Sequence, residues 1–289
     1  MSTAAPPRPP ALGPTGPVLA ELRPRRAAAL GAFRALLLRD LAVLRKELPL
    51  FVVRTVMQPF LLLFVFTYVF PRIGQAIGGP GQGAADFSTM LVSGVVATAM
   101  IFQGIQAVAL PLVREFGYTR EIEDRVMAPL PTSMVAFEKI LFGAMQSALA
   151  AVLVFPMVLF FPNANVHAHV NVVLLVAEII VACLAAGSLG LAIGTSWNPR
   201  QVPLIFSLIV IPITFLGCIY YPWASLHSIR WLQIVILANP LVYVSEGLRG
   251  AITPSLQHMP WPVSLGVLIV IGAGLAWLGM RGFRKRVLG

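Results

Sequence analysis

The sequence predicts an all-α integral membrane protein with six transmembrane helices, an N-terminal interfacial amphipathic helix and an extracellular re-entrant helical hairpin before the last span. Hydrophobic residues make up 58% of the 289 residues and charged residues only 11%, whereas about a quarter of an average soluble domain is charged. One soluble core could not bury so many apolar side chains, so a bilayer is indicated as a second apolar solvent. The formal net charge of +10 comes from basic residues mostly outside the apolar runs, which indicates a membrane orientation signal rather than nucleic-acid binding.

The first 50 residues contain two segments of different character. Residues 1–28 are rich in proline, alanine and arginine, which predicts a disordered cytoplasmic tail without a removable signal peptide. Residues 29–50 carry apolar side chains at steps of three and four, which predicts an amphipathic helix in the membrane interface. A helix packed on a soluble domain is the alternative, but no soluble domain follows. The apolar series is Leu30, Phe33, Leu37, Leu41, Leu44 and Leu48.

Residues 51–289 are predicted to form the six-span domain. Six apolar stretches reach the roughly 20 residues that a membrane span needs. They lie near residues 53–70, 87–113, 134–161, 171–197, 202–221 and 261–280. A further apolar run, residues 231–244, is shorter and contains Pro240, so it predicts a re-entrant or interfacial hairpin rather than a seventh span.

Basic residues favour six spans with both termini in the cytoplasm. This topology leaves only Arg72, Arg230 and Arg249, of the 21 Lys and Arg residues, on the outer side. A seventh span would move the basic C-terminal residues outside, against the positive-inside rule.

No motif for ATP hydrolysis or metal-dependent catalysis is evident. None of the lysines belongs to a G-x-x-x-x-G-K-[ST] phosphate loop, and no H-E-x-x-H segment is present. Ser188 lies in a small-residue run, but no histidine lies within a span to act as its base, so helix packing is favoured over catalysis. His167 and His169 lack a nearby carboxylate or cysteine, which leaves a metal site incomplete. We therefore expect no catalytic residue, no metal and no cofactor bound by this chain.

Several ionisable residues interrupt or border the apolar stretches. Glu178 lies well inside the fourth stretch, where a carboxylate is costly. Two interpretations stay open: it lines a substrate route or joins a relay, or it is a structural group that is paired or protonated. Arg54, Glu138 and Lys139 lie within about one turn of a span end, so we interpret them as snorkelling to the interface.

The connection between the second and third stretches, residues 114–132, differs from the other connections. It is dense in mixed charge and ends in prolines. This pattern predicts a small cytoplasmic helix offered to a protein partner, with a plain solvated loop as the alternative.

Three segments resemble the permeases of the ABC-2 type exporter family. Residues 114–131 are similar to the charged cytoplasmic connection of that family and the P-L turn after it. Residues 239–249 are similar to its N-P-L-x-x-x-x-E-x-x-R segment, and residues 212–222 to its P-x-x-F segment that ends in an aromatic and a proline. Their order and spacing extend the resemblance over nearly the whole chain after residue 28, and it is closest to daunorubicin-resistance-type drug exporters and to lipid or polysaccharide exporters.

The resemblance implies a permease subunit of an ATP-driven exporter in the bacterial plasma membrane, with an amphipathic substrate: a drug, a lipid or a lipid-linked glycan. A separate ATP-binding subunit would hold ATP and Mg, and a second permease copy or a paralogue would complete the membrane pair. The resemblance also implies that the amphipathic helix is an elbow helix. The implied coupling helix to the ATP-binding subunit contains Arg114, Glu115, Arg120, Glu121, Asp124 and Arg125. The implied exit hairpin and substrate path contain Asn239, Pro240, Tyr243, Glu246, Arg249 and Glu178.

Two alternatives accompany this interpretation. Glu246 and Arg249 are three residues apart on a predicted helix, so they could pair with each other or contact the substrate. The rival function is a secondary transporter driven by an ion gradient, which would favour paired intramembrane carboxylates and internal repeats. Glu178 alone, with no evident repeat, argues against that function.

Overall fold

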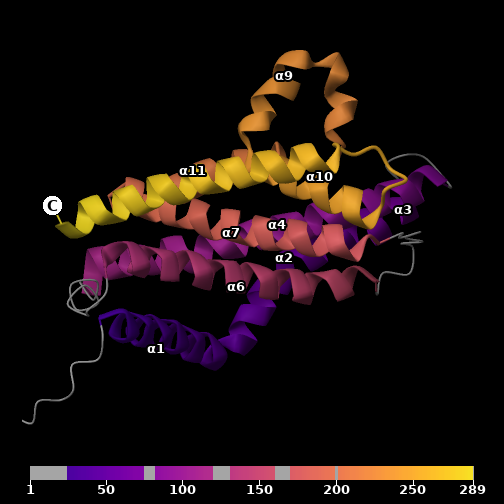
Figure 1. The fold of residues 1–289 in the computed structure, drawn as a ribbon. Helices are drawn as coiled ribbons and strands as arrows, with labels where there is room; N and C mark the ends of the chain where they lie inside the picture. Colours follow the sequence, from indigo (N-terminus) through magenta and orange to yellow (C-terminus); the bar gives the residue numbers. More distant parts are fainter. Residues whose placement is uncertain (1–24, 75–81, 120–130, 160–169, 199–200, 289) are drawn as a thin grey trace, which may run out of the picture.

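The computed structural model describes residues 25–74, 82–119, 131–159, 170–198 and 201–288. These residues form a bundle of long helices with no strand among them (Figure 1). The helical elements are α1 (Arg25–Lys46), α2 (Leu48–Phe64), η1 (Val65–Val69), α3 (Phe70–Arg72), α4 (Gln82–Arg114), η2 (Glu115–Thr119), α6 (Thr132–Leu159), α7 (Val172–Ser196), α8 (Val202–Phe215), η3 (Trp223–Ser228), α9 (Arg230–Val235), η4 (Ile236–Ala238), α10 (Pro240–Ile252) and α11 (Trp261–Leu288).

Five helices of the described residues are long and apolar enough to cross a membrane. They correspond to the first four predicted stretches and to the last: Leu48–Arg72, Met90–Gly117, Thr132–Pro156, Val172–Ser196 and Trp261–Val287. A sixth candidate is the pair formed by residues 230–238 and α10, which passes the same test together but is bent by 98°. The prediction of an all-helical membrane protein is therefore confirmed, with five or six candidate spans in the described part.

The fifth predicted stretch, residues 202–221, is shorter than its hydropathy indicated. α8 has 14 residues, which cover only about 21 Å at 1.5 Å per residue, whereas the hydrocarbon core is about 30 Å thick. The chain leaves the helix at Leu216 and turns at Cys218, whose φ is 54°. Hydropathy does not register this turn because the residues around it are apolar. Farther along the chain, α9 projects from the side of the bundle (Figure 1).

α1 starts at Arg25, earlier than the predicted boundary at residue 29, and ends before α2 begins at Leu48. Its inward side carries Phe33 and Leu44, which pack in two apolar clusters with residues of α6 and α11. Leu30 belongs to the predicted apolar series but is 58% exposed. The residues of the predicted apolar series are therefore divided between a packed face and an exposed face of α1.

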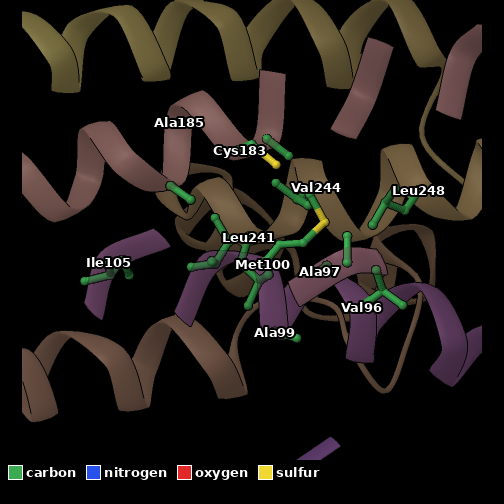
Figure 2. Close-up of a cluster of buried hydrophobic side chains, with 14 of the residues drawn as sticks. Val96, Ala97, Ala99, Met100, Ile105, Cys183, Ala185, Leu241, Val244 and Leu248 are labelled. Carbon is green, nitrogen blue, oxygen red and sulfur yellow. The ribbon is translucent and has the colours of Figure 1, made fainter. Parts of the chain in front are cut away.

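α4 and α7 form the centre of the bundle, and α10 packs against both of them. Figure 2 shows Met100 of α4, Cys183 of α7 and Leu241, Val244 and Leu248 of α10 in one buried apolar cluster. α10 is therefore part of the core of the bundle, although it is too short to span a membrane alone.

Gly187 allows the backbones of α6 and α7 to touch. A Cβ atom placed on Gly187 would lie only 2.5 Å from the carbonyl oxygen of Ile140. The neighbouring Ser188 is buried, and its hydroxyl donates a hydrogen bond of 2.7 Å to the carbonyl of Leu184 in its own helix. Residues 187–190 thus act in close helix packing, the usual use of small residues in membrane helices.

Replacing Gly187 with alanine is expected to destabilise the protein by about 1–3 kcal/mol, the usual range for overpacking a core. The new methyl group would meet a backbone carbonyl, so α6 and α7 would have to separate. Gly274→Ala in α11 is the matched control, because an added Cβ meets nothing within 4 Å there. Thermal unfolding of the two purified variants measures the difference, and equal stabilities would contradict the backbone contact.

Candidate functional site

The start of α10 is held by side chains of the predicted exit hairpin. The Asn239 side chain accepts a hydrogen bond of 2.9 Å from the N–H two residues on and donates one of 2.8 Å to the carbonyl of Ile213. Pro240 occupies the first turn of the helix, where its missing N–H is not needed. The Tyr243 hydroxyl donates 2.8 Å back to the carbonyl of Leu237. These contacts stabilise the bend between η4 and α10.

Glu246 and Arg249 form a fully buried ion pair one turn further along α10. One oxygen of Glu246 accepts from the Arg249 guanidinium and from the backbone N–H of Trp223, at 2.8 Å. The other oxygen accepts from the backbone N–H of Met259 at 2.8 Å. Arg249 also donates 2.8 Å to the carbonyl of Cys218. The pair therefore ties α10 to the turn after α8, to the start of η3 and to the loop before α11.

Glu178 of α7 lies against α10. Its side chain is nearly fully buried, and a Cβ placed on Gly247 would fall 2.2 Å from its Oε1 atom. Gly247 thus makes room for the carboxylate, because any side chain there would collide with it. Oε1 has no hydrogen-bond partner among the described residues. The structure brings Glu178 to the helix that carries the other predicted exit residues.

Two of the six predicted coupling residues lie in the described part of the chain. Arg114 ends α4 and Glu115 begins η2, whereas Arg120, Glu121, Asp124 and Arg125 lie outside the described residues. The Phe116 ring is 5.8 Å from that of Phe283 near the end of α11, so α4 and α11 end at the same end of the bundle. We call this the basic end, after Arg114, Arg281, Arg284 and Lys285.

At the basic end, a buried lysine joins three helical elements. The Nζ atom of Lys139 in α6 lies 3.0 Å from a carboxylate oxygen of Asp40 in α1 and 3.0 Å from one of Glu115 in η2. We call these three residues the Lys139 cluster. The interpretation of Lys139 and Glu138 as snorkelling residues is wrong, since their exposed fractions are only 2% and 0%.

One feature of the sequence indicates part of this cluster. Asp40 falls between Leu37 and Leu44 at helical spacing, so it places a carboxylate on the packed face of α1. Lys139 lies 99 positions away, and no local pattern joins the two.

A cleft with both polar and apolar walls opens beside α2, bordered by α4, by α8 and by the turn after α8. Its polar lining consists of Arg54, Thr55, Gln58, Thr98, Gln103, Gln106, Thr214 and Tyr220. Arg54 donates a hydrogen bond of 3.3 Å to Gln103, which in turn donates to the hydroxyl of Thr55. A second cleft, of about 420 Å³, lies between α1, α2, α4 and α6 and is also bordered by Arg54. Neither cleft is evident from the sequence, because single polar residues on separate helices form no motif.

The described residues contain no group of three or more His, Cys, Asp and Glu side chains that could hold a metal ion. His167 and His169 lie outside the described ranges.

A helical bundle with five or six candidate spans and partly polar clefts between its helices has the build of a membrane permease. The profile of the ABC-2 type transporter family matches residues 31–253, most of the chain. The chain belongs to the ABC-2 type transporter family, which confirms the resemblance seen in its sequence motifs. It is therefore the membrane component of an ABC transporter, and its family implies association with an ABC ATP-binding subunit.

Two relatives illustrate the match. The inner membrane transport permease YadH of Escherichia coli (strain K12) is 26% identical over 221 residues, which cover 75% of this chain and 82% of the relative. The putative transport permease ycf38 of Porphyra purpurea is 25% identical over 196 residues, which cover 64% of this chain and 65% of the relative. The bacterial relative and the candidate spans support a multi-pass protein of the inner membrane.

Proposed function

We propose that this chain is the permease subunit of an ATP-driven exporter that moves an amphipathic substrate, such as a drug, a lipid or a lipid-linked glycan, out of the cell. The Lys139 cluster is the observation that carries this proposal. It joins α1 and α6 to η2, from which the predicted coupling segment continues. A partner that pushes on this segment would move α1 and α6 with it, which is how packed elements transmit a switch.

The proposal includes an orientation and an assembly. Both termini and the basic end face the cytoplasm, in agreement with the positive-inside rule. α1 is the elbow helix, and its exposed residues Leu30 and Leu38 suit a helix lying in the membrane interface. Two permease copies, or one copy and a paralogue, combine with two ATP-binding subunits.

In this proposal the substrate passes from the clefts beside α2 to the segment from η3 to α10. The clefts beside α2 admit the substrate, since their polar side chains lie within candidate spans where such groups usually face a polar interior. The hairpin from η3 to α10 caps the exit, held by the Glu246 and Arg249 pair, with Glu178 against its inner side.

Affinity purification of the tagged chain in mild detergent tests the proposal. We expect a stoichiometric partner with a phosphate-binding loop and an ATPase activity that the permease alone lacks. In proteoliposomes, transport should require ATP and survive ionophores that collapse proton and sodium gradients. A solitary permease whose transport follows an ion gradient would overturn the proposal and direct attention to Glu178.

A further inference from the structure

Arg54 is a cation inside a candidate membrane span. It lies in the second turn of α2, within the span Leu48–Arg72. Its guanidinium donates a hydrogen bond of 3.3 Å to Gln103, and no carboxylate of the described ranges forms an ion pair with it. A cation at membrane depth is costly unless it pairs or faces a polar route. Most of the N–H donors of the guanidinium remain for a ligand.

Three hollows meet at this guanidinium. The first cleft, beside α2, lies on one side of it, with Thr98 and Gln106 in its wall. The second cleft, between α1, α2, α4 and α6, lies on another side, and its volume of about 420 Å³ falls in the usual range for ligand sites, roughly 300–1,000 Å³. The third hollow is an open groove on α2 that continues from Arg54 along apolar side chains. One cation thus borders two clefts with polar side chains in their walls and an apolar groove.

The apolar groove has the dimensions of a lipid chain. Val53, Met57 and Leu61 line it and are 57%, 50% and 52% exposed. Between Arg54 and Val65 the helix rises by about 17 Å at 1.5 Å per residue. That rise is close to the depth of one leaflet, about half of a hydrocarbon core of roughly 30 Å.

The charged residues that line the second cleft favour the binding of an anion at Arg54. Its acidic lining residues are Asp40, Glu47 and Glu115, of which Asp40 and Glu115 hold Lys139. Arg39 and Arg114 also line this cleft, so basic residues outnumber acidic ones. A guanidinium with open donors matches the oxygens of a phosphate or carboxylate, which it can bind in a bidentate manner.

We propose that Arg54 binds the anionic headgroup of a membrane amphipath of the phospholipid type, whose hydrocarbon chain lies in the groove of α2 from Val53 to Phe66. The headgroup occupies the two clefts, and its phosphate or carboxylate oxygens accept hydrogen bonds from the guanidinium. The inference rests on the proposed function in one respect only, namely that such an amphipath represents the transported substrate class.

Photolabelling of the full-length permease in dodecyl maltoside micelles, which contain no phosphate that could compete, tests the site. The probe is phosphatidylglycerol with a diazirine on its acyl chain, and diacylglycerol with the same chain is the control probe. We expect phosphatidylglycerol to label the α2 peptide about tenfold more strongly than diacylglycerol, the factor for one charge-assisted hydrogen bond. Soluble glycerol 3-phosphate should not compete, because it lacks the chain that fills the groove.

Variants of the cation sharpen the test. Arg54→Gln should lower labelling by phosphatidylglycerol about tenfold, whereas Arg54→Lys, which keeps the positive charge but loses the bidentate geometry, should retain part of it. Arg45→Gln is the matched control, because Arg45 is an exposed arginine of α1 that lies outside the three hollows. The comparison of the two probes on the unmodified chain needs no variant, so a poorly folded Arg54→Gln protein does not remove the test.

Three results would overturn the inference. They are equal labelling by the two probes, competition by glycerol 3-phosphate, which would show a free phosphate site, and α2 crosslinks between two permease copies in place of lipid labelling. The labelling requires neither ATP nor a partner. Specific labelling without a co-purifying ATPase would therefore support the lipid site and contradict the proposed exporter. A co-purifying ATPase without specific labelling would support the exporter and contradict the lipid site.

Discussion

An Arg249→Met variant is expected to lose about 3–5 kcal/mol of stability, the cost of removing one partner from a buried ion pair. Glu246 would keep its two backbone donors, from Trp223 and Met259, but would lose the only cation that the described residues place beside it. The carbonyl of Cys218 would lose its donor as well. The segment from η3 to α10 should therefore loosen from the bundle. Thermal unfolding in detergent measures the loss.

Arg230→Met is the matched control, because Arg230 begins α9 on the exposed surface. Its unfolding temperature should stay close to that of the unmodified chain. A double variant, Glu246→Gln with Arg249→Gln, should recover part of the stability because no uncompensated buried charge remains. If Arg249→Met proved as stable as Arg230→Met, the ion pair would not be what holds the segment from η3 to α10 on the bundle.

The parts of the fold that depend on local sequence could be predicted. Hydropathy locates five of the six predicted spans because each is a continuous apolar run, and the spacing of Glu246 and Arg249 already allowed their pairing. The failures involve contacts between distant positions. The guanidinium of Arg249 reaches a carbonyl 31 positions away, and Lys139 reaches Asp40 across 99 positions. A pattern inside one helix contains neither partner.

The same distinction between local patterns and contacts of distant positions applies to the candidate sites. Pro240 and a short apolar run mark the segment that is predicted as an exit hairpin, and no local pattern indicates the anchors of α10 on α8 and on the turn after it. Arg54 is interpreted from the sequence as a snorkelling residue because it lies near a span end, and the structure leaves its side chain exposed. Its environment includes Gln103 of α4 and the second cleft, and these become neighbours only when three helices pack.

A Lys139→Met variant is the second change with a large expected effect. Asp40 and Glu115 would then lose the ammonium that lies 3.0 Å from each of them, and the ion pair of Asp40 with Arg39, at 3.5 Å, would remain. Removing one member of such a buried cluster costs about 3–5 kcal/mol, and α1 should lose its charged anchor to α6 and η2. We expect reduced thermal stability of the permease and a large loss of vanadate-sensitive ATPase activity in the purified complex.

A milder variant separates coupling from folding. Asp40→Asn leaves Lys139 paired with Glu115 and keeps a hydrogen-bond acceptor in place, so the permease should fold and bind its partner. Since α1 would be held less firmly, the ATPase rate of the assembled complex should still fall, and Lys46→Met, at an exposed lysine at the end of α1, should leave it unchanged. A normal rate in Asp40→Asn, with the partner bound, would mean that the cluster stabilises the fold without carrying motion from the ATP-binding subunit. The proposed transmission would then have to run through α4 alone, because α4 is the element that continues directly into η2.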